Sequence, residues 1–157
     1  MWYALFMIYL AADHRGFQLK EAIKKSLIER GIEIEDRGAL VYDAGDDYVD
    51  FAAAATAKIA ENPSVHKGIF ICGSGHGVDI VANKFRGVRA ALCWNAQVAK
   101  QSREHDDANV LVLAADACDE AQAQDIVLVW LGAGFSGEDH HIRRLKKIDE
   151  IEQKNFR

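Results

Sequence analysis

The sequence predicts an α/β fold, a Rossmann-like three-layer αβα domain with a five-stranded parallel sheet and a C-terminal tail helix. Short apolar runs alternate with longer segments of helical period, which is typical of a parallel sheet covered by helices on both faces. The 157 residues are 50% hydrophobic and contain a single proline. A chain of this length can bury a substantial core, so we expect one domain over residues 1–157.

The expected strands are the most apolar runs of the chain. They cover residues 7–11, 32–35, 68–72, 89–93 and 109–114. An extension over residues 1–6 precedes them. The apolar stretch that it forms with the first strand is shorter than the roughly 20 residues of a membrane-spanning helix. We therefore expect no membrane partner.

The expected helices carry apolar residues at helical spacing or consist of good helix formers. They cover residues 17–30, 51–60, the segment from the third strand's glycine-rich turn to 84, 96–103, 120–131 and about 139–157. Gly31 ends the first helix and Asn62-Pro63-Ser64 ends the second. The tail helix has an apolar stripe, so we expect it to pack against a second subunit.

Charge and cysteine content restrict the class of protein. A net charge of -5 argues against a nucleic-acid binder, since such a partner attracts a positive surface. The three cysteines are too few and too widely spaced for a zinc cluster or a disulfide framework, and an odd number suits a reducing compartment. We expect free thiols and a cytoplasmic protein.

A glycine-rich loop follows the third strand. In an open parallel sheet, ligands bind where loops meet at the carboxyl ends of the strands. Cys72 ends this strand, and residues 73–77 read GSGHG before a helix. Alternate glycines let backbone N–H groups turn inward and the helix dipole adds positive charge, so the loop can hold an anion. The alternative is a tight turn that only packs closely; the spacing matches neither a P-loop nor a dinucleotide fingerprint.

Three side chains, one cysteine and two histidines, are candidates for chemistry, and the other two cysteines are set aside. Cys72 stands at a helix mouth, where a thiolate is favoured and can act as a base, whereas Cys93 and Cys118 lack such a setting. The alternative for Cys72 is a small buried hydrophobic residue. His14 and His105 have neighbouring carboxylates, which suit proton transfer, although each could be a surface histidine in a charged loop.

The segments around these residues are expected to face one cleft. DHRG (residues 13–16) follows the first strand, and EHDD (104–107) ends the helix after the fourth strand. A metal site is not expected, because His140 and His141 are adjacent rather than four residues apart and one helix face cannot present both.

Five longer segments carry a family resemblance. They read AADHRGFQLKEAIKKSL, DRGA, DDYVDFA, GIFICGSGHGVDIVANKFRGVRAALC and SREHDDANVLVL, within a stretch from about residue 7 to residue 147. Together they resemble the type B ribose-5-phosphate isomerases and their relatives, the galactose-6-phosphate isomerase subunits. The cysteine and glycine block with its ANK-x-x-G-x-R-A continuation is long and specific.

The resemblance implies an aldose–ketose isomerase of carbohydrate metabolism, in the pentose phosphate pathway, that moves a proton between adjacent carbons through a cis-enediolate without a cofactor or metal. By position, Cys72 corresponds to the carbon base, Ser74 assists the loop, and His105 opens the sugar ring with Asp13 near it. The substrate-binding positions are His14, Arg15, Tyr48, Gly73, Gly75, His76, Gly77, Asp106, His140, Arg143 and Arg144. The resemblance further implies a homodimer, or two such dimers joined, with sites at the subunit interface. His105 and the tail arginines would then serve the cleft of the neighbouring subunit.

The chain departs from the family in three single positions. Asp106 stands where the family has Asn, His76 where the loop is usually apolar or Asn, and Asp79 where a small residue is usual.

The tail departs further, because the family's Gly-Gly-Arg-His-x-x-Arg reads GEDHHIRR here over residues 137–144. Without a gap the two arginines become Asp139 and Arg143; with one inserted residue, the alignment we prefer, they become His140 and Arg144. One guanidinium fork is lost either way, and histidine lacks its paired donors to a phosphate.

We therefore predict an isomerase that interconverts ribose 5-phosphate and ribulose 5-phosphate. One alternative is an isomerase of another phosphorylated or free sugar, since the altered tail weakens the phosphate contacts. The other is a non-catalytic sugar-phosphate-binding subunit, which would have no need of a carbon base such as Cys72.

Overall fold

A computed structural model describes residues 6–156. Residues 1–5 of the expected extension and residue 157 of the tail lie outside the described residues. Five parallel strands form one sheet in the order β2-β1-β3-β5-β4. The strands are β1 (Ile8–Ala12), β2 (Ile34–Asp36), β3 (Lys67–Cys72), β4 (Ala90–Leu92) and β5 (Val110–Ala114).

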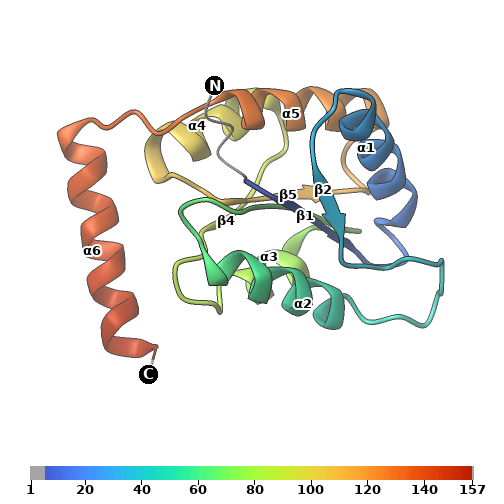
Figure 1. Cartoon of the computed structure of the whole chain (residues 1–157), viewed down its shortest axis with the longest axis horizontal. Coiled ribbons are helices and arrows are strands. Elements are labelled where there is room, and N and C mark those ends of the chain that lie inside the picture. The colour runs from blue at the N-terminus through green and yellow to red at the C-terminus, as the bar shows by residue number, and fades with distance from the viewer. Residues whose placement is uncertain (1–5, 157) are drawn as a thin grey trace.

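Helices cover both faces of this sheet (Figure 1). The helices of the described residues are α1 (Phe17–Glu29), α2 (Tyr48–Glu61), α3 (His76–Ala82), α4 (Ala96–Asp106), α5 (Glu120–Gly132) and α6 (Asp139–Asn155). α1, α4 and α5 lie on one face, and α2 and α3 on the other. The predicted fold class is confirmed.

Strand residues alternate between two cores because successive side chains of a strand point to opposite faces. Ile69 and Ile71 of β3 lie in the core beneath α1 and α5, together with the fully buried Trp130. Phe70 and Cys72 lie in the core beneath α2 and α3. This double burial is why β3 is uniformly apolar.

Capping residues move two helix ends beyond the predicted ranges. α2 begins at Tyr48 rather than at residue 51, because the Asp47 side chain accepts a hydrogen bond from the Val49 N–H (3.0 Å). α4 continues to Asp106 rather than ending near residue 103; Asp107 then adopts a left-handed conformation (φ 45°) and ends it. His105 and Asp106 therefore belong to a helix end.

α6 extends away from the sheet at the left of Figure 1, and the loop between β2 and α2 projects at the right. The C-terminal end of α6 contacts the α3–β4 connection, where the Gly87 N–H donates to Glu152 (2.8 Å). Within residues 6–156, no helix combines the length and the apolar character needed to cross a membrane.

Candidate active site

The Cys72 thiol lies at the carboxyl edge of the sheet, where β3 passes into the glycine loop. Its side chain is 5% exposed, and the backbone N–H of Gly75 donates a hydrogen bond to Cys72 Sγ (3.2 Å). Gly75 has φ 80°, in the left-handed region that favours glycine. The turn that directs this N–H at the sulfur therefore depends on a glycine, and a main-chain donor is in place to stabilise negative charge on the sulfur.

Tyr48 packs against the far side of the same loop. A Cβ atom added at Gly77 would lie 2.5 Å from the Tyr48 ring, so only glycine allows this approach. Ser74 and His76 are exposed, and the His76 N–H donates to Ser74 Oγ (3.4 Å). The structure thus brings the first residue of α2 to the loop that follows β3.

Asp13 directly follows the neighbouring strand, β1, at the same edge. Its buried carboxylate accepts hydrogen bonds from the N–H groups of Arg15 and Gly16 (3.0 Å each). These bonds hold the turn that leads into α1. The Asp13 carboxylate therefore has a structural role in this turn, separate from any contact with a substrate.

His14 is held by a residue that the sequence analysis missed, Asp46. Asp46 Oδ1 accepts from the His14 backbone N–H (3.0 Å) and lies 2.7 Å from His14 Nδ1. The other oxygen, Asp46 Oδ2, is buried without a hydrogen-bond partner among residues 6–156. With Nδ1 engaged by the carboxylate, Nε2 is the His14 nitrogen left to meet a ligand.

Arg15 also has an unforeseen partner. Its guanidinium forms an ion pair with Asp116, which follows β5, and it lies where a side chain at Gly73 would project. The Asp116 N–H in turn donates to the Gly73 carbonyl (3.0 Å). Arg15 therefore lies at the glycine loop, but with its charge shared by a carboxylate.

His105 and Asp106 lie at the opposite edge of the sheet, so the expectation that the EHDD segment shares a cleft with Cys72 in one chain was wrong. The physical reason is the direction of α4. A helix between two parallel strands runs back across the sheet, and α4 begins at the carboxyl end of β4 and ends just before Val110, at the amino end of β5.

The tail residues gather at this opposite edge, near His105. The ring of His105 stacks on that of His141 (centroids 4.5 Å apart, 25° between planes), and the Ser136 N–H donates to the Glu104 carbonyl (3.0 Å). His140 lies beside His141, with ring centroids 4.0 Å apart. Arg143 and Arg144 follow on α6 and are exposed.

The other two cysteines differ from Cys72 in their setting. Burial raises the pKa of Cys93 to about 11. Burial, together with Asp119, also raises the pKa of Cys118 above its usual value. Both are thus neutral thiols near pH 7, which fits the structural role expected for them.

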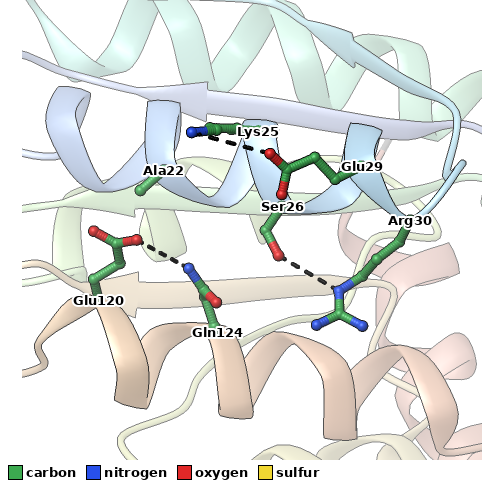
Figure 2. Close-up of a pocket in the computed structure, with 7 residues that line it drawn as sticks. All are labelled: Ala22, Lys25, Ser26, Glu29, Arg30, Glu120 and Gln124. Carbon is green, nitrogen blue, oxygen red and sulfur yellow. Dashed lines mark hydrogen bonds and ion pairs between the residues drawn. The ribbon is translucent and has the colours of Figure 1, made fainter.

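A polar groove between α1 and α5 lies away from these residues. A cavity of about 480 Å³ separates α1 from α5 (Figure 2). Its polar side chains are paired along each helix, as in the contacts Arg30 Nε to Ser26 Oγ (3.5 Å) and Gln124 to Glu120 (3.0 Å). No predicted site residue lines it.

Comparisons with known proteins agree with the sequence resemblance. The model of the Ribose/Galactose Isomerase family matches residues 8–148. Ribose-5-phosphate isomerase B of Escherichia coli is 40% identical over 147 residues, which are 94% of this chain and 97% of that protein. The Mycobacterium tuberculosis protein of the same name is 41% identical, over 93% of this chain and 90% of its own length.

A solved structure is also closely similar to this chain. Ribose-5-phosphate isomerase B from Mycoplasma genitalium, with bound ribulose-5-phosphate, superposes with a TM-score of 0.93 at 39% identity, covering 96% of this chain and 99% of that one. The family match includes β3, the glycine loop and the first part of α6. The chain therefore belongs to the ribose/galactose isomerase family, as a relative of its type B ribose-5-phosphate isomerases.

Proposed function

We propose that this protein is an aldose–ketose isomerase that interconverts ribose 5-phosphate and ribulose 5-phosphate. The observation that carries the proposal is the Cys72 sulfur, held against the Gly75 N–H at the carboxyl edge of the sheet. It occurs in a chain about 40% identical, over almost its full length, to ribose-5-phosphate isomerases B.

The reaction needs a base and a group that takes up negative charge. The Cys72 thiolate removes the proton from C2 of the open-chain aldose, and the electron pair forms the C1–C2 double bond of a cis-enediolate. The C1 oxygen gains the charge, and main-chain N–H groups of residues 73–77 stabilise it. The thiol then returns the proton to C1 while the O2 proton passes to O1, which yields the ketose.

A second copy of the chain completes this site in the proposal. Cys72 and His105 lie at opposite edges of one sheet, so the ring-opening imidazole comes from a partner in a homodimer. The half-buried His105 and the exposed Arg143 and Arg144 lie at the amino edge, where a two-fold arrangement can present them to the partner's glycine loop. His14, Tyr48 and the loop itself come from the same chain as Cys72.

A substrate panel tests the proposal. Purified protein is incubated with ribose 5-phosphate, a hexose 6-phosphate and free ribose, and ketose formation is followed in a coupled assay. We expect ribose 5-phosphate to give the highest kcat/KM. Preferred turnover of a free sugar or a hexose phosphate would assign a different isomerase substrate, and binding of ribose 5-phosphate in calorimetry without turnover of any sugar would contradict the enzyme assignment.

A further inference from the structure

Three metal-ligating side chains meet where the connection from α5 enters α6. One ligand atom from each of Glu138, His140 and His141 lies within 4.8 Å of the other two. We propose that these three side chains bind a divalent transition-metal ion, with zinc as the best match. The proposal concerns a metal site and goes beyond the isomerase activity.

The geometry corrects the argument that adjacent histidines cannot share a metal. Neighbouring side chains of a helix leave its axis about 100° apart, but the two imidazole rings still converge here, and one nitrogen of each lies within 4.8 Å of the other. Here both histidines occupy the first turn of α6, and the preceding Glu138 is extended (φ -67°, ψ 141°). The Glu138 carboxylate lies 3.4 Å from His140 Nδ1, and the two imidazole rings are only 4.0 Å apart, tilted by 50°.

His141 is held in place as metal-binding histidines usually are. Its Nδ1 lies 2.7 Å from Ser136 Oγ, and its ring is 5% exposed, between those of His105 and His140. A hydrogen bond to one ring nitrogen fixes the ring and leaves the other nitrogen for the metal.

The donor set indicates which metal fits. Two imidazoles and one carboxylate form the three-ligand set of open zinc sites, in which water or another ligand takes the fourth position. Calcium and magnesium prefer oxygen ligands throughout, so the imidazoles disfavour them. Glu138 and Asp139 are both acidic and offset the positive end of the α6 dipole, so the start of this helix can accept a cation.

Zinc titration of the full chain tests the site. After dialysis against a chelator, isothermal titration with Zn²⁺ is expected to give one ion per chain. Glu138→Gln and His140→Ala alter side chains that are not fully buried, and each should weaken binding at least about tenfold, as should Ser136→Ala through the orientation of His141. His76→Ala removes an exposed histidine elsewhere and serves as the matched control.

Cobalt provides a second readout that does not depend on affinity alone. Co²⁺ bound to two nitrogens and one oxygen gives visible d–d bands, which should appear with the unaltered chain and with His76→Ala and be absent with Glu138→Gln. Circular dichroism establishes that each variant is folded. The proposal is overturned if the unaltered chain takes up no stoichiometric Zn²⁺, or if Glu138→Gln and His140→Ala bind it as tightly as the control.

Discussion

Asp79, in the first turn of α3, is a residue at which burial opposes ionisation. Its Oδ1 is buried without a hydrogen-bond partner among residues 6–156, and burial raises its pKa above the usual carboxyl value. An acid with a raised pKa in the folded state costs stability once the pH exceeds that pKa. The ionised carboxylate therefore destabilises the protein at neutral pH.

The corresponding prediction is that Asp79→Asn stabilises the protein at pH 7. We expect the free energy of unfolding to rise by about 0.5–1 kcal/mol, a small gain because the group is only half-buried. The gain should shrink as the pH falls toward about 4, where the native carboxyl is also neutral. Urea unfolding of both proteins at several pH values measures this, and a gain that stays constant with pH would show that charge is not the cause.

At the scale of elements, an ion-pair cluster joins the end of β2 to α1. The fully buried Lys20 Nζ lies 2.5 Å from Asp36 Oδ2, and Lys24 Nζ lies 2.8 Å from the same oxygen. Burial opposes ionisation of Asp36, but hydrogen bonds from the two lysines and the Gly38 N–H outweigh it and hold the pKa of Asp36 below its usual range. The edge strand β2 is thereby fixed to the helix that packs on it.

Removing Asp36 should destabilise the protein strongly. Asp36→Ala leaves the Lys20 charge buried without its main partner, a change that costs roughly 3–5 kcal/mol. Lys24→Ala removes the more exposed lysine and should cost about 1 kcal/mol or less. The double variant Lys20→Met, Asp36→Leu should recover most of the stability, because no buried charge remains. Urea unfolding that ranks Asp36→Ala no lower than Lys24→Ala would refute this account of the cluster.

The elements themselves could be predicted because their signals are local. β3 and β5 are short runs of buried apolar residues, and α6 has apolar residues at regular helical spacing. What the prediction missed were helix ends set by single capping residues, Asp47 and Asp107, whose effect depends on backbone conformation. Periodicity specifies the body of a helix, whereas a cap depends on one or two hydrogen bonds.

At the scale of the whole molecule, only part of the candidate site could be predicted from the sequence. Cys72 and its loop are contiguous, so their proximity follows from chain order. The contact between His14 and Asp46 joins residues 32 positions apart through a loop with no motif. His105 was misplaced for another reason, since the direction of a crossover helix decides which edge its last turn reaches.

Mixing two inactive variants tests whether two subunits share each site. In the proposed dimer, Cys72→Ser and His105→Ala damage different halves of the same site. Each variant alone should be nearly inactive, while co-expression should restore about a quarter of the unaltered activity if subunits pair at random, because each mixed dimer retains one intact site. Co-expression that restores no activity, from subunits that light scattering shows to be dimeric, would place both residues in one chain's site.

Hydrogen exchange at the substrate carbon tests the role of the Cys72 sulfur most directly. Ribose 5-phosphate is incubated with enzyme in deuterium oxide, and NMR follows both ketose formation and the loss of the C2 proton signal. The account predicts that Cys72→Ser slows both by about 10²–10⁴-fold, while Cys93→Ser and Cys118→Ser leave both near the unaltered rate. Exchange that continues at the unaltered rate in Cys72→Ser would contradict it.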